Sequence, residues 1–89
     1  MRVNVHFFGN FKYLAERSEE SVEIHNNANV RELLDLLTDK YIKMANILSP
    51  DKITKSHVLI IKGEKPVLDY VTKLTEGDQI YLFIMLAGG

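Results

Sequence analysis

The sequence predicts an α+β domain in which a mixed sheet of four or five strands is covered on one face by one main helix. Three observations support this. Apolar and polar residues alternate near both ends of the chain, an apolar stripe with helical spacing lies between them, and turn residues separate the segments. The chain has 89 residues, which indicates one domain with a modest core.

Two strands are predicted near the N-terminus. Apolar and polar residues alternate over residues 2–8, and Val22 and Ile24 alternate with polar neighbours in a shorter second strand. Between them we expect a short helical or irregular stretch over 11–15 and a polar loop over 16–20. Because the two strands are close in sequence, an antiparallel hairpin is the simplest pairing.

The most regular pattern in the chain is that of a helix of about three turns. Asn29 is followed three residues later by Glu32, which predicts a helix N-cap close to a capping box. The apolar residues that follow recur at the spacing of one helix face. They are Val30, Leu33, Leu34, Leu37 and Tyr41.

The second half of the chain predicts strands again. Residues 44–55 are expected to form a loop with at most one helical turn. A third strand is predicted over 57–61, a brief edge strand over 67–68, a turn over 75–78 and a final strand over 79–85. The order strand, strand, helix, strand, short strand, strand, with a helix held across the sheet, is that of the β-grasp or ubiquitin-like fold.

Composition excludes several classes of function. The chain has no cysteine, so it has no disulfide, no thiolate metal site and no catalytic thiol of its own. Its histidines, His6, His25 and His57, do not have the spacing of metal ligands, and no metal site is predicted. A formal net charge of −1 gives no electrostatic reason to expect nucleic-acid binding. Without a signal peptide or a membrane-spanning apolar run, a soluble cytoplasmic protein is expected.

The chain ends in Gly88-Gly89, directly after the predicted final strand. We therefore expect a β-grasp domain over 1–85 and a flexible tail over 86–89. Glycine suits a terminus that another enzyme threads through a narrow channel to the α-phosphate of ATP, because it has no side chain. The resulting acyl-adenylate would accept a sulfur or amine nucleophile. The chain offers no catalytic group for these steps, so it is predicted to be a non-catalytic substrate that reacts at Gly89. A frayed end without a function is the open alternative.

The final strand predicts a partner interface, because both of its faces are apolar and one helix covers only one face of a sheet. Ile80, Leu82 and Ile84 form one row. We expect the other row to face outward and to contact a partner together with the start of the tail; these residues are Tyr81, Phe83, Met85, Leu86 and Ala87. Leu59 and Ile61 would extend this surface. The open alternative is that residues 42–55 fold over it.

Four segments resemble the MoaD/ThiS family of ubiquitin-like sulfur carriers, and MoaD more than ThiS. The resemblance covers nearly the whole chain. The matching segments are Phe7-Phe8-Gly9, Asn29-Val30-Arg31-Glu32-Leu33-Leu34, the Gly77-Asp78 turn before the last strand, and Gly88-Gly89. The tail lacks the proline pair usual in MoaD proteins, and Lys62-Gly63 replaces the family's asparagine-glycine pair.

The resemblance implies that a MoeB-like enzyme uses ATP to adenylate Gly89, which then becomes a thiocarboxylate. As the small subunit of molybdopterin synthase, such a chain would be a monomer alone and form a heterotetramer with a MoaE-like large subunit, where its sulfur enters molybdopterin. No cofactor of its own is implied. The alternatives are a protein modifier conjugated to lysines through Gly89, a ThiS-like carrier for thiamine thiazole synthesis, and an interaction module without tail chemistry.

Overall fold

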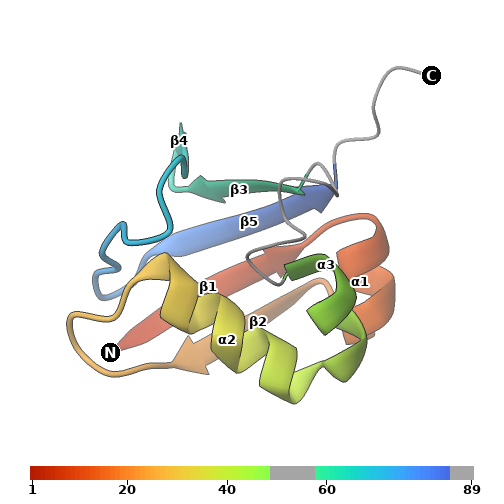
Figure 1. Ribbon diagram of the computed structural model, residues 1–89. Coiled ribbons are helices and arrows are strands. Elements are labelled where there is room, and N and C mark those ends of the chain that lie inside the picture. Colours follow the sequence, from red (N-terminus) through yellow and green to blue (C-terminus); the bar gives the residue numbers. More distant parts are fainter. Residues whose placement is uncertain (49–57, 85–89) are drawn as a thin grey trace.

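The computed structural model describes residues 1–48 and 58–84, and it confirms the predicted α+β, β-grasp fold (Figure 1). A five-stranded mixed sheet lies behind one main helix, and three short helical segments accompany that helix. In chain order the elements are β1 (Arg2–Phe7), α1 (Asn10–Ala15), β2 (Glu19–Glu23), α2 (Val30–Lys40), the 3-10 helix η1 (Ile42–Met44), α3 (Ala45–Leu48), β3 (Val58–Lys62), β4 (Lys65–Pro66) and β5 (Gln79–Ile84). No helix in this described part is long and apolar enough to span a membrane.

The sheet has the strand order β2-β1-β5-β3-β4. β1 and β2 form the expected antiparallel hairpin, with Val3 opposite Val22. β5 lies parallel to β1 and antiparallel to β3, so the first and last strands of the domain are neighbours at its centre. This arrangement brings the end of β5 to the middle of the sheet, at Ile84, rather than to an edge.

The structure differs from the sequence-based expectation at two edges of the sheet. β2 begins at Glu19, inside the segment expected to be a polar loop, because Glu20 is buried and extends the in–out alternation of Val22. The short edge strand is Lys65–Pro66, two residues earlier than expected. Proline has no amide hydrogen to donate, and only an edge strand tolerates it. Residues 49–57 and the predicted last strand residue, Met85, lie outside the described part.

The core lies between the sheet and α2. The Asn29 side chain accepts a hydrogen bond from the Glu32 amide (2.9 Å) and Glu32 accepts one from the Asn29 amide (3.3 Å), which confirms the capping box. The helix then presents its predicted stripe to the sheet, with Tyr41 as the C-cap residue. The largest side chains that this packing buries are Phe7, Phe11, Leu33, Leu37, Met44, Leu48, Ile80 and Leu82.

The buried carboxylate of Glu20 links β2 to the end of α2 through hydrogen bonds. Lys40 donates a hydrogen bond to Glu20 (2.7 Å), the Tyr41 hydroxyl donates another, and the Arg17 guanidinium lies 3.3 Å away. Burial raises the pKa of Glu20, but these hydrogen bonds and the positive charges outweigh burial and hold the pKa below its ordinary value. Burial and the Glu20 carboxylate raise the pKa of Tyr41 to about 12.

Glu20→Gln should therefore change how stability depends on pH. The folded-state pKa of Glu20 lies below 4.5, so its ionised form stabilises the fold above that pH, and the contribution is lost as the pH falls through the folded-state value. The variant should be less stable than the wild type by about 1 kcal/mol at neutral pH. Urea unfolding at neutral pH and well below pH 4.5 measures the difference in free energy of unfolding between the two proteins. This difference should be smaller at the lower pH. A difference that stays constant would contradict this assignment.

Candidate functional site

Tyr81 and Phe83 lie on the face of the sheet opposite α2, as the sequence predicted for the outer row. Their neighbours on β5, Ile80 and Leu82, are fully buried in the core, and the alternation of a strand places Tyr81 and Phe83 on the other side. The part of 42–55 that the structure describes, residues 42–48, packs with α2 on the core side, where Met44 and Leu48 are buried (Figure 1).

Aromatic rings cross from β1 to β5 on this outer face. Phe8 stacks on Phe83 with ring centroids 4.4 Å apart and planes 8° from parallel. His6 stacks on Tyr81 at 4.6 Å and 14°. Phe8 also approaches Tyr81 at 6.3 Å. Stacked pairs of this kind contribute about 0.5–1.5 kcal/mol each beyond the area they bury, so the four rings hold one another in place.

Two residues of β3 complete the surface. Leu59 lies opposite Phe83 and Ile61 lies opposite Tyr81 in the antiparallel pairing, which confirms that both extend the predicted row. All of these side chains remain partly accessible, and Phe8 is 41% exposed. We call this surface the aromatic face; it consists of His6, Phe8, Leu59, Ile61, Tyr81 and Phe83.

The aromatic face is polar at one end and apolar at the other. Near the start of β5, Gln79 accepts a hydrogen bond from His6 Nε2 (2.7 Å), and Glu19 lies 3.8 Å from the other ring nitrogen of His6. Phe8, Phe83 and Leu59 lie at the opposite end, beside Ile84. The apolar end of the face is therefore the end at which the chain leaves β5 towards its C-terminus.

Sequence reasoning missed His6 and Phe8 as members of this face. From the sequence, Phe8 is noted only within the segment Phe7-Phe8-Gly9, and His6 is noted only as a histidine without the spacing of a metal ligand. The signal was available, because the alternation that sends Val5 and Phe7 into the core sends His6 and Phe8 outward. Gly9 then turns the chain away with φ +57° and ψ −128°, a conformation that favours glycine.

The other predicted site residues lie outside the described part of the chain. They are Met85, Leu86, Ala87, Gly88 and Gly89. Their roles, and the boundary between a domain over 1–85 and a tail over 86–89, stay predictions. Within residues 1–48 and 58–84, no group of three or more His, Asp or Glu side chains could hold a metal ion. His25 instead pairs with Glu32, whose hydrogen bond raises the pKa of His25.

Comparison with known proteins gives related proteins over the whole length of the chain, although no family model matches it. Small archaeal modifier protein 3 of Haloferax volcanii is 27% identical over 92 residues that cover both proteins completely. The putative molybdopterin converting factor subunit 1 of Pyrococcus furiosus is 24% identical, with a TM-score of 0.79, over 97% of this chain and 99% of that one.

A second similar structure is a complex of subunits 1 and 2 of molybdopterin-converting factor from Helicobacter pylori. It is 24% identical over 100% of both chains, with a TM-score of 0.64. These likenesses agree with the strand order, the main helix and the resemblance found in the sequence. The chain therefore has the ubiquitin-like β-grasp fold, and over its length it is similar to a small archaeal modifier protein and to MoaD-like subunits of molybdopterin-converting factor.

Proposed function

We propose that the chain is a sulfur carrier whose C-terminal Gly89 is adenylated and converted to a thiocarboxylate, and that it donates this sulfur in molybdopterin synthesis. The observation that carries the proposal is the position of the aromatic face. Its apolar end borders Ile84, where β5 ends five residues before the terminal carboxylate. An enzyme that docks on this face would have the tail within reach of its nucleotide.

The chemistry needs only the terminal carboxylate of this chain. A carboxylate oxygen attacks the α-phosphorus of ATP, and pyrophosphate leaves. A sulfide equivalent then attacks the carbonyl carbon of the acyl-adenylate, and AMP leaves with the electrons of the broken C–O bond. The activating enzyme supplies the nucleotide site and any acid or base. The described residues of this chain contribute the docking face.

We infer two partners for the same surface. A MoeB-like enzyme would load Gly89, and a MoaE-like large subunit would then receive the charged tail, giving a heterotetrameric synthase in the cytoplasm. Support comes from the Helicobacter pylori complex, in which a protein of the same fold binds a second subunit. An apolar patch flanked by polar residues is also the usual composition of a protein interface.

A second candidate function is that of a protein modifier conjugated to lysines. The full-length likeness to small archaeal modifier protein 3 favours it. The adenylate would be the same, but a lysine amine would attack its carbonyl carbon and AMP would leave as an isopeptide bond forms. The aromatic face would dock the activating enzyme in both cases.

Intact mass spectrometry separates these candidates. The full chain is incubated with ATP, sulfide and the MoeB-like enzyme, with and without a lysine-bearing acceptor. Exchange of one oxygen for one sulfur, followed by sulfur transfer to a precursor pterin in the presence of the MoaE-like subunit, is expected for the carrier. Covalent conjugates formed with loss of water support the modifier. An unchanged mass in both reactions would contradict both proposals.

A further inference from the structure

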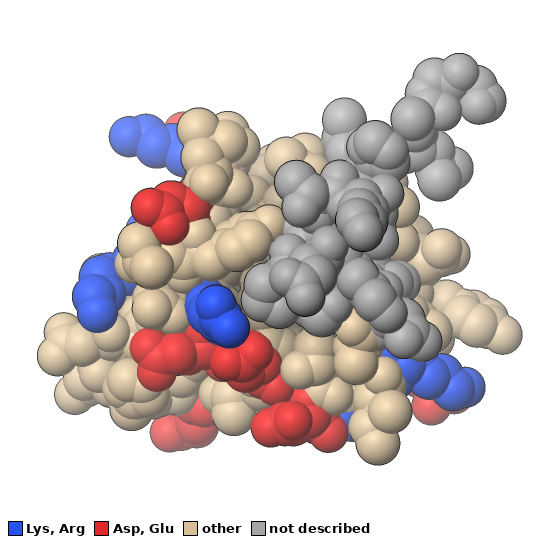
Figure 2. All heavy atoms as spheres, viewed as in Figure 1, with Lys and Arg blue, Asp and Glu red and all other residues tan. Residues whose placement is uncertain are grey.

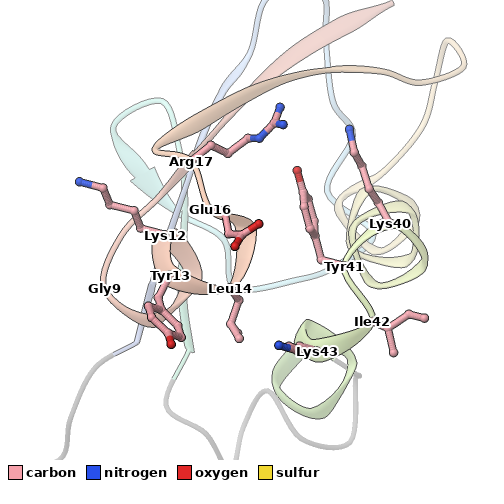
Figure 3. A pocket seen from close by; sticks show the side chains of 10 residues that line it. All are labelled: Gly9, Lys12, Tyr13, Leu14, Glu16, Arg17, Lys40, Tyr41, Ile42 and Lys43. Atoms are coloured by element: carbon pink, nitrogen blue, oxygen red, sulfur yellow. The ribbon is translucent and has the colours of Figure 1, made fainter.

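A second surface lies at the end of the molecule where α1 faces the end of α2 and η1 (Figure 3). The chain forms a groove of about 850 Å³ here, within the range of volumes typical of ligand sites. The groove is distinct from the aromatic face, because Gly9 turns the chain from one surface to the other. We call it the basic groove, after the lining residues Lys12, Arg17, Lys40 and Lys43.

Positive charge is concentrated at this groove. Four cations and one carboxylate, Glu16, line it and give a net charge of +3. Since the whole chain has a formal net charge of −1, all other residues together carry −4. Figure 2 shows Asp and Glu side chains gathered over the α2 side of the molecule instead. Even when the buried Glu20 beside the groove is counted, the local net charge is +2.

Part of this charge is available to a ligand. Arg17 and Lys40 hold Glu20, yet their side chains remain 52% and 53% exposed. Lys12 and Lys43 are exposed, and neither forms an ion pair with any residue in the described ranges. Glu20 also shows that this end of the molecule can hold a carboxylate, through one guanidinium, one ammonium and one phenol.

Apolar side chains lie among these cations. Tyr13 and Ile42 line the groove and are 82% and 78% exposed, the kind of large apolar exposure that marks a binding surface when it lies in a concave site. Leu14 and the ring of Tyr41 form half-buried walls. A ligand that fills the groove would therefore have apolar groups as well as negative charge.

A small inorganic anion fits the groove poorly. Figure 3 shows Lys12 and Lys40 on opposite sides of it, with the Glu16 carboxylate between them. Cations spread in this way suit several separate carboxylates, whereas a single phosphate held by Arg17 and Lys40 would have to compete with Glu20 for both of them. Charge complementarity and the apolar side chains together favour a peptide.

We propose that the basic groove binds an acidic segment of a partner protein, in which carboxylates flank at least one apolar side chain. This site goes beyond the proposed function, because it uses neither the aromatic face nor the C-terminus. A partner bound here leaves the aromatic face available to the activating enzyme.

The test is a titration of the full, ¹⁵N-labelled chain with an acetylated peptide in which glutamates flank leucine and phenylalanine. We expect saturable amide shifts over residues 9–17 and 40–43. The double variant Lys12→Glu/Lys43→Glu should weaken binding about tenfold or more, which corresponds to about 1.4 kcal/mol. The matched control Lys65→Glu/Lys73→Glu changes net charge equally, outside the groove, and should weaken it far less.

Several results would overturn the proposal. Equal weakening by both double variants would show that only net charge matters. The same shifts with inorganic phosphate at equal concentration would indicate a small-anion site. Equal binding of a peptide with glutamine for glutamate would exclude carboxylate recognition. Phe83→Asp should leave peptide binding unchanged, and a loss there would show that the groove and the aromatic face are one site. The mass experiment on Gly89 is independent of all these outcomes.

Discussion

A chain that lacks Gly88 and Gly89 should form no adenylate and no thiocarboxylate, while its free energy of unfolding stays within about 0.5 kcal/mol of the full chain. The described core lies between Val3 and Leu82, and glycine contributes no side chain to it. The shortened chain still ends in a carboxylate, on Ala87. Loss of reaction would therefore show that the activating enzyme needs the two glycines. They give the tail enough length to reach the nucleotide, and they give it an end without side chains.

A matched variant separates these two requirements. Replacing Gly88-Gly89 by Ala-Ala keeps the length of the chain and adds two methyl groups. If the channel of the enzyme is narrow, the rate of pyrophosphate release should fall strongly; if only reach matters, it should stay near the wild-type rate. Circular dichroism and urea unfolding provide the control for folding. Undiminished charging of the shortened chain would refute the assignment of Gly89 as the reacting residue.

The sequence predicted those features of the fold that local patterns encode. The capping box of Asn29 and Glu32 and the stripe from Val30 to Leu37 belong to one helix, so the residues that define them lie only three or four positions apart and can be recognised in the sequence. The alternation along β5 likewise placed Tyr81 and Phe83 correctly on the outer face. Both patterns depend on the periodicity within one element and not on contacts between residues far apart in the sequence.

Features that depend on distant contacts could not be predicted in this way. Glu20 lies in a polar stretch that resembles a loop, and its burial depends on Lys40 and Tyr41, twenty and more residues later. The basic groove brings Lys12 and Arg17, near the start of the chain, together with Lys40 and Lys43, and the sequence alone does not show that these two distant segments meet. The aromatic face needed the register of β1 against β5 before His6 could be placed on Tyr81.

Two neighbouring residues of β5 should have opposite roles in stability and binding. Leu82 is fully buried, and Leu82→Ala should destabilise the fold by about 2–5 kcal/mol through lost packing and a residual cavity. Phe83 is partly exposed on the aromatic face, so Phe83→Asp should cost only about 1–2 kcal/mol, mainly through the lost stacking with Phe8. Urea unfolding of both variants measures this contrast.

The effects on binding should rank the other way: Phe83→Asp should weaken binding to the activating enzyme more than Leu82→Ala does. An exposed ring at the apolar end of a docking face is a typical interface hot spot, and a charge in its place should weaken binding by about 2 kcal/mol or more, roughly 30-fold. Asn4→Asp introduces the same charge at the polar end of the sheet and should change the affinity only slightly. Calorimetric titration of the MoeB-like enzyme into each folded variant measures the effect.

If Phe83→Asp binds as tightly as Asn4→Asp, docking does not use the aromatic face. If Phe83→Asp instead unfolds the chain as severely as Leu82→Ala, then Phe83 supports the core, and the outer row is structural rather than a binding surface.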